Sequence, residues 1–207
     1  MPVTDSGEVL SAKSAAERGF DHLAGWMRKA EKVWDDNRAA NMSLIEQFDY
    51  YGKLASQFPM SQLRVVYAAS GTIPAACLLR KSSAVIEHGI YWSPASTVGE
   101  AHFLLSILNS EAARVRAAPQ QARGQWGARH FDKVMFNLPI PRFDSKIKLH
   151  SEIAAAAAKA EKIAAVTALP ENVKFQRARG LIRNALIEDG VAGEIDDLVV
   201  RLLDGET

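Results

Sequence analysis

The sequence predicts an α+β fold in which helices dominate, with one small antiparallel sheet packed on a buried helix. Over most of the chain, apolar residues recur every three or four positions, as on one face of a helix. Residues 62–92 instead are rich in β-branched and aromatic residues and partly alternate, which favours strands. In residues 100–109, which follow, the apolar residues recur at helical spacing. We expect these residues to form a helix that packs on the sheet. Thr97 and Glu100 at its start have the spacing of a capping box.

We expect three segments along the chain. Residues 1–60 form an N-terminal helical segment, residues 61–144 an α+β domain, and residues 145–207 a C-terminal helical segment. A length of 207 residues allows one large domain or two small ones. Because 48% of the residues are hydrophobic and 24% are charged, the chain has the composition of a folded protein with a buried core.

Two helical regions are predicted in the N-terminal segment. From about residue 11 to residue 40, apolar residues recur at helical spacing with charged residues between them. A second helix is predicted over residues 43–57. Ser43 and Glu46 have capping-box spacing there, in which each side chain satisfies a free backbone N–H group of the helix start.

Three strands are predicted in the sheet. The first spans residues 64–70, the second is the apolar run 75–79, and the third is the alternating run 84–92. Residues 134–138 are a candidate fourth strand. The single cysteine, Cys77, cannot form an internal disulfide, and its apolar surroundings in the sequence predict a small core residue.

Three helices are predicted in the C-terminal segment, over residues 145–169, 173–189 and 193–203. The first contains a run of alanines, the residue with the strongest helix propensity. Gly190 is placed to end the second, because glycine adopts the left-handed conformation that commonly terminates helices.

The composition and the motifs exclude several classes of function. The formal net charge is only +1, so a nucleic-acid surface would require local segregation of charge. No histidine has a second ligand at zinc-site spacing, and no Gly-x-Ser-x-Gly elbow or Walker loop is present. We therefore expect no catalytic residue, no bound cofactor and no metal site on this chain. No apolar run approaches the ~20 residues of a membrane span, and the N-terminus has no apolar signal core, which predicts a cytoplasmic protein.

Basic residues are concentrated between residues 114 and 148. This segment holds eight lysines and arginines but only two acidic residues, Asp132 and Asp144. Phosphates attract such a segment, and the release of counterions drives binding. The alternative interpretation from composition is a solvated loop anchored by Trp126.

The loop at residues 119–133 contains the side chains best suited to reading DNA. Glutamine and arginine can form bidentate contacts with adenine and guanine edges, and a tryptophan can stack or wedge between bases. We expect Arg129 to brace the loop or to touch phosphate. The candidate DNA-binding residues are Gln121, Arg123, Gln125, Trp126, Arg129 and Lys133.

Residues 98–144 also carry a family resemblance. The predicted buried helix ends in Leu-Asn-Ser at residues 108–110, a loop follows, and the chain leaves through Leu-Pro-Ile-Pro at residues 138–141. This order resembles the target-recognition domains of type I restriction specificity subunits and of the C-terminal parts of adenine-specific (N6) DNA methyltransferases. The run at residues 129–133 is more similar to the methyltransferase version. The resemblance covers about residues 57–144.

The resemblance implies a sequence-specific DNA target-recognition module, the non-catalytic C-terminal part of an N6-adenine DNA methyltransferase of a restriction-modification or phage-defence system. The chain lacks the glycine-rich S-adenosylmethionine loop and the Asn/Asp-Pro-Pro-Tyr/Phe motif of that family, so no catalysis by this chain alone is expected. The implied partners are double-stranded DNA and a methyltransferase catalytic domain, upstream or on another chain, which would hold S-adenosylmethionine. The alternative is a protein–protein interaction module derived from such a domain, without DNA readout.

Overall fold

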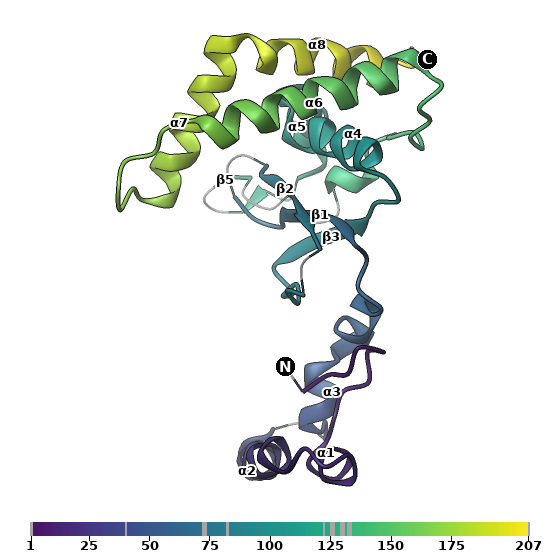
Figure 1. The fold of residues 1–207 in the computed structure, drawn as a ribbon, viewed down its shortest axis with the longest axis vertical. Coiled ribbons are helices and arrows are strands. Elements are labelled where there is room, and N and C mark those ends of the chain that lie inside the picture. Colours follow the sequence, from purple (N-terminus) through teal and green to yellow (C-terminus); the bar gives the residue numbers. More distant parts are fainter. Residues whose placement is uncertain are drawn as a thin grey trace. The chain divides into compact units, whose positions relative to one another are not determined.

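The computed structural model describes residues 2–39, 41–71, 74–81, 83–121, 123–124, 127–128, 131 and 134–206. The chain divides into two compact units (Figure 1). The first unit consists of Met1–Ser61 with Ser82–His88, and the second of Gln62–Lys81 with Gly89–Thr207. The predicted fold class, a helix-dominated α+β fold with a small antiparallel sheet, is confirmed. Among the described residues, no helix has both the length and the apolar character needed to cross a membrane.

The first unit is built from short helices. These are α1 (Ala12–Glu17), α2 (Asp21–Asn37) and α3 (Leu44–Phe48), followed by the 3-10 turns η1 (Tyr50–Gly52) and η2 (Ala55–Gln57). The helical pattern predicted for residues 11–40 is divided in two, because Gly19 adopts a left-handed φ of +76° after α1. Glu31 still ties the two helices together, since its Oε1 accepts the Ala12 N–H at 2.8 Å.

Helix α3 begins as predicted but is shorter than predicted. The capping box is confirmed: Ser43 Oγ accepts the Glu46 N–H at 3.2 Å, and Glu46 Oε2 accepts the Ser43 N–H at 2.7 Å. Beyond the helix, Asp49 Oδ1 accepts the N–H groups of Leu54 and Ala55 at 3.0 and 2.8 Å. These side-chain contacts offer the backbone an alternative to helical bonding, which explains why tight turns replace the predicted helix end.

The sheet in the second unit has three antiparallel strands, β1 (Leu63–Ala68), β2 (Ala76–Arg80) and β3 (Ile90–Pro94), in the order β2-β1-β3. At the centre of β1, Val66 pairs with Cys77 on one side and with Trp92 on the other. The central strand is the most buried, as expected for a strand with neighbours on both edges.

The third strand is shorter than the sequence predicts, because residues 83–88 are held by the first unit. Gln57, which is 4% exposed, pairs with the backbone of Ile86. Its Nε2 donates to the Ile86 carbonyl at 2.8 Å, and the Ile86 N–H donates to Gln57 Oε1 at 2.7 Å. A side-chain amide therefore takes the backbone bonds that a sheet neighbour would have provided.

Two predictions about the sheet are wrong. Residues 134–138 do not add a strand, because Val134–Asn137 form the 3-10 helix η4. Phe131, Met135 and Leu138 are all buried, and their spacing of three or four residues suits a helical turn. Cys77 is exposed and not part of the core, because β2 is an edge strand and the neighbours of Cys77 turn toward the core instead.

Helix α4 (Val98–Asn109) forms the centre of the second unit. Ala101, Phe103, Ile107 and Leu108 are fully buried in the largest core cluster, against the sheet and the C-terminal helices. Thr97 Oγ1 caps the helix by accepting the Glu100 N–H at 3.1 Å. Glu100 Oε2 returns to the N–H of the preceding Ser96, so only half of the predicted capping box forms.

Four more helices complete this unit: α5 (Glu111–Ala117), α6 (Lys148–Val166), α7 (Phe175–Asp189) and α8 (Val191–Leu203). The sequence did not predict α5, because the basic residues of this helix look like the start of the basic loop. Gly190 ends α7 in the left-handed conformation, φ +88°, as predicted. Figure 1 shows α6 and α8 running along each other above α4 and α5.

Gly180 inside α7 and Gly190 directly after it should respond oppositely to replacement by alanine. Gly190→Ala places a Cβ in the left-handed region and should lower the free energy of unfolding by about 1 kcal/mol. Gly180→Ala lies inside the helix with open space around its Cβ position and should raise that free energy by roughly 0.5–1 kcal/mol. Urea unfolding followed by circular dichroism measures both. Shifts of the same sign would contradict this account of the helix end.

Candidate nucleic-acid interface

The Leu-Asn-Ser motif at the end of α4 has a structural role for each residue. Leu108 is fully buried in the core. Asn109 Oδ1 accepts the Ala76 N–H at 2.9 Å, and its Nδ2 donates to the Ala76 carbonyl at 3.1 Å. Ser110 Oγ caps α5 by accepting the Ala113 N–H at 3.0 Å. The motif therefore closes the outer edge of β2 at Ala76 and starts the next helix.

A loop leaves the core after η3 (Ala118–Gln120) and returns to it at Phe131. Phe131 is 2% exposed, and its N–H donates to the Ala69 carbonyl at 2.7 Å. Between these points, β4 (Arg123–Gly124) pairs antiparallel with β5 (Gly127–Ala128), with Gly124 opposite Gly127. The predicted DNA-reading loop thus contains a short hairpin whose returning end is fixed beside the sheet.

The structure places only some of the predicted DNA-binding residues. Gln121 follows η3 and is half-buried, and its Nε2 atom is buried and makes no hydrogen bond to any described residue, which does not favour contact with a base. Arg123 lies in β4, opposite Ala128. Beyond what the structure describes are the Arg123 side chain and all of Gln125, Trp126, Arg129 and Lys133. The arrangement of these side chains therefore stays a prediction.

Several basic residues of the segment 114–148 are engaged in ion pairs. Arg114 Nε lies 2.8 Å from Glu111 Oε2, which holds the pKa of the Glu111 carboxyl below its ordinary value. Arg116 pairs with Asp204 and donates to the Leu203 carbonyl at 3.1 Å, linking α5 to the end of α8. Lys148 pairs with Glu152 at 3.4 Å. The local excess of positive charge is therefore smaller than the sequence of this segment indicates. Arg142 and Lys146 stay exposed.

Helix α7 carries a basic surface that the sequence analysis missed. Lys174, Arg177, Arg179 and Arg183 lie in a stretch, residues 172–187, that contains no acidic residue. Within the described part of the chain, none of the four forms an ion pair. The absence of acidic residues between Glu171 and Glu188 was the available sequence signal.

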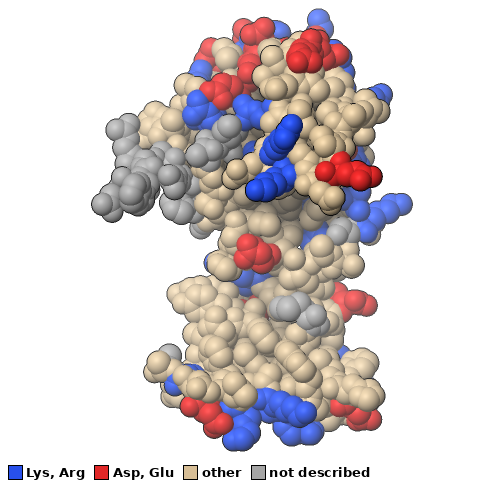
Figure 2. Space-filling view, turned by 90° about the vertical axis from the view of Figure 1, so that its left-hand side faces the viewer, with Lys and Arg blue, Asp and Glu red and all other residues tan. Residues whose placement is uncertain are grey.

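The start of α7 and the base of the hairpin loop meet the same turn of the sheet. This turn connects β1 to β2 at residues 69–75. Phe131 binds the Ala69 carbonyl at one end of it, and Arg179 Nη2 approaches the Pro74 carbonyl at 3.4 Å at the other. Figure 1 shows β5 and the start of α7 at one edge of the second unit, and Figure 2, which faces that edge, shows exposed Lys and Arg side chains there.

Phe175 adds an exposed aromatic ring to this surface. It is 72% exposed, and the Arg179 guanidinium lies over the ring, 5.6 Å from its centre. This stacking orients Arg179 without neutralising its charge. The surface thus combines a hairpin, the exposed cations Lys174 and Arg177, and an aromatic ring.

A groove of about 640 Å³ lies beneath α7. Its apolar lining includes Ala157, Ala160 and Ala164 from one face of α6. Arg183 and the exposed Cys77 also line it. No residue of α7 is buried, so this helix covers the groove without filling it.

A charged cluster next to the groove joins three elements. Glu161 on α6 accepts from Arg80 Nη2 of β2 at 2.8 Å and lies 2.8 Å from His102 Nε2 of α4. The Arg80 guanidinium, followed by the His102 contact, lowers the pKa of Glu161 to about 2. These contacts link α6 to β2 and to α4. His102 is 8% exposed and packs inside the second unit.

No group of residues in the described part of the chain is arranged to hold a metal ion. Comparisons with models of protein families, with characterised proteins and with solved structures found no match to this chain.

Replacing Asn109 tests whether the motif holds the edge of β2. Asn109→Ala leaves the Ala76 N–H and carbonyl without their partner and should cost about 1 kcal/mol of unfolding free energy, since the site is open to water. Asn109→Asp should cost at least as much, because a carboxylate cannot donate to the Ala76 carbonyl. Asn184→Ala, on the exposed face of α7, is the control and should change stability by less than about 0.5 kcal/mol. Equal effects at both positions in chemical denaturation would contradict the proposed edge closure.

The Glu161 cluster predicts a pH dependence of stability. Because the pKa of Glu161 is lower in the folded state than its ordinary value of 4.5, the ionised carboxylate favours folding. This stabilisation is fully present above about pH 4.5 and should be lost as the pH falls toward about 2. Glu161 is 41% exposed, so we expect the contribution to be only about 1 kcal/mol.

Urea unfolding of wild type and Glu161→Gln across this pH range measures the effect. The difference between the two proteins should shrink as the pH falls, whereas the exposed Glu171→Gln should follow wild type throughout. A difference that does not change with pH would indicate that packing, and not the charge of Glu161, stabilises the cluster.

Proposed function

We propose that this chain is the target-recognition module of an adenine-specific (N6) DNA methyltransferase from a restriction-modification or phage-defence system. The observation that carries the proposal is the position of the β4–β5 hairpin. The returning end of its loop is fixed at the β1–β2 turn, and the same turn is met by the basic start of α7. A reading element and a phosphate-binding element therefore share one edge of the second unit.

The hairpin loop and α7 have different roles in this proposal, because the bases and the phosphates of duplex DNA offer different contacts to a protein. A two-stranded β-ribbon fits into the major groove, where each base pair shows a distinct pattern of donors and acceptors. Phosphate contacts fix the register of a protein on DNA but carry no sequence information. In this proposal the hairpin loop supplies the readout, and Lys174 and Arg177 at the start of α7 contact the phosphates.

Roles within the loop are assigned by side-chain chemistry. Arg123, with Gln125, reaches base edges through bidentate contacts. Trp126 stacks against or wedges between bases. Arg129 and Lys133 contact phosphate or brace the loop. The facing pair Gly124 and Gly127 leaves the hairpin backbone free of side chains where it approaches DNA.

Catalysis belongs to another part of the system in this proposal. The sequence contains neither the methyl-donor loop nor the Pro-Pro catalytic motif of the family that it resembles. A methyltransferase catalytic domain, upstream or on another chain, would bind S-adenosylmethionine and act on the adenine. The module would then work in the cytoplasm beside this domain and its DNA.

A protein–protein interaction module is the second candidate, and one observation favours it. The groove beneath α7 is lined largely by apolar side chains, and α7 leaves it unfilled. A module that had lost DNA readout would use such a surface to hold a protein partner. The two candidates differ in whether the chain recognises DNA sequence.

Binding of the full chain to duplex DNA at low salt tests the proposal. A pool of randomised duplexes should enrich a preferred sequence, to which affinity is then measured by fluorescence anisotropy over a salt series. Lys174→Ala with Arg177→Ala should weaken binding to every sequence and reduce the salt slope by about two units. Arg123→Ala with Gln125→Ala should relax the preference, at about 1–3 kcal/mol for each lost base contact.

The control variant is Arg28→Ala with Lys53→Ala, which removes two exposed cations from the first unit. It should leave both the sequence preference and the salt slope unchanged. If no sequence is enriched and neither α7 nor the loop variants alter binding, the interaction-module candidate takes precedence.

A further inference from the structure

Helix α2 exposes a stripe of large apolar side chains. Trp26 is 52% exposed and Val33 is 62% exposed. Together with Ala30 they lie at positions i, i+4 and i+7, on one face of the helix. The opposite face supplies Ala24 and Met27 to the core of the first unit, and Ala30 packs partly against that core, so Trp26 and Val33 are the exposed part of the stripe.

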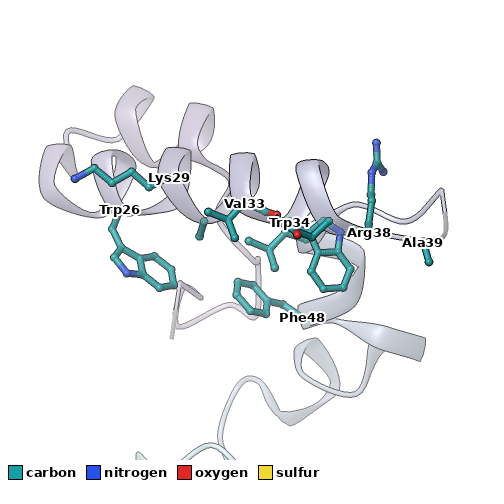
Figure 3. A pocket seen from close by; sticks show the side chains of 10 residues that line it. Trp26, Lys29, Val33, Trp34, Arg38, Ala39 and Phe48 are labelled. Atoms are coloured by element: carbon teal, nitrogen blue, oxygen red, sulfur yellow. Dashed lines mark hydrogen bonds between the residues drawn. The ribbon is translucent and has the colours of Figure 1, made fainter.

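The stripe forms one wall of a groove of about 700 Å³ between α2 and α3. Figure 3 shows Trp26, Val33, Trp34 and Phe48 along this groove. Trp34 is held in place by its Nε1–H, which donates to the Met42 carbonyl at 2.7 Å. The groove is therefore concave, apolar and partly preformed, as is typical of sites that accept a helix.

The charges at the groove have one sign. Lys29 and Arg38 line it toward its two ends, and none of its described lining residues is acidic (Figure 3). Lys29 has no ion-pair partner among the described residues. Arg38 Nε lies 3.2 Å from Asp35 Oδ1, and Asp35 does not line the groove.

We propose that this groove docks an amphipathic helix of a partner protein, with an apolar stripe flanked by aspartate or glutamate. The apolar side chains would fill the space between Trp26 and Phe48, and the carboxylates would face Lys29 and Arg38. This inference is independent of DNA binding, because it uses the first unit alone.

A second copy of this chain fits the groove less well. A two-fold contact would use the same patch on both copies. Pairing two α2 helices in antiparallel fashion would bring Lys29 of one copy toward Arg38 of the other. Like charges at both ends oppose such a contact, whereas an acidic partner helix satisfies them.

A selection experiment with the full chain tests the proposal. A displayed library of helical peptides, randomised at every position, is selected on wild type and counter-selected on Val33→Glu. Val33 is largely exposed, so this variant should fold, which circular dichroism checks. We expect enriched peptides with apolar residues at i, i+4 and i+7 and with flanking aspartate or glutamate.

Charge reversal then tests the predicted orientation of the partner. Lys29→Glu should weaken binding of the enriched peptides roughly fivefold or more, because an attraction becomes a repulsion. Arg28→Glu is the matched control, since it makes the same change one residue away, outside the groove lining. It should leave affinity within about twofold, as screening in salt limits more distant charges.

Three outcomes would overturn the proposal. The first is no enrichment above the Val33→Glu background, and the second is enrichment of peptides without an acidic flank. The third is concentration-dependent dimerisation of wild type in sedimentation that Val33→Glu abolishes, since the occupant would then be a second copy.

Discussion

The packing of α4 between the sheet and α6 is the contact on which the second unit depends. The side chains of this helix that face the sheet and α6 are almost fully buried, and they touch β1 on one side and α6 on the other. Ser106, which is 2% exposed, adds a polar tie, because its Oγ donates to the Ile153 carbonyl of α6 at 2.9 Å. The sheet has only three strands and would be marginal alone, so this helix provides the surface that makes it stable.

The exit from the hairpin loop is fixed by the same helix. Phe143 lies against Gly99 at the start of α4, where an added Cβ would come within 3.2 Å of the ring. Phe143 and His150 both pack near Phe103 of α4, with ring centres 5.5 and 4.8 Å from it. His150 is buried, which lowers its pKa, and its Nδ1 accepts the Asp144 N–H at 3.0 Å. Both ends of the loop region therefore depend on α4. The C-terminus of α4 leads into α5, and the N-terminus of α4 packs against Phe143, where the chain leaves the loop region.

Local signals in the sequence predicted the parts of the fold that local chemistry controls. The capping box at Ser43, the helix end at Gly190 and the three strands are encoded within a few residues, and the structure confirms them. The errors arose where distant groups decide the outcome. Gln57 takes the backbone of Ile86 out of the predicted third strand, and the exposure of Cys77 follows from the edge position of β2. Neither the contact between Gln57 and Ile86 nor the edge position of β2 can be recognised from the residues that lie next to them in the sequence.

The same distinction applies to the candidate interface. The motif that suggested a target-recognition domain consists of residues with structural roles, with Leu108 in the core, Asn109 at the edge of β2 and Ser110 capping α5. Such a motif bears on the fold more directly than on DNA readout, and the resemblance stays a prediction.

A count of basic residues in the sequence overestimates the positive charge that the folded chain can offer to a partner. Arg114 and Arg116 contributed to the predicted basic segment, yet the structure uses both in ion pairs. In α7, by contrast, Arg177 and Arg183 have no ion-pair partner in the described part of the chain. In a protein with a net charge of only +1, cations left unpaired by folding are a more informative guide to partners than cations clustered in the sequence. They point to two separate surfaces, α7 beside the hairpin in one unit and the groove at Lys29 in the other. Each surface can therefore be tested without altering the other.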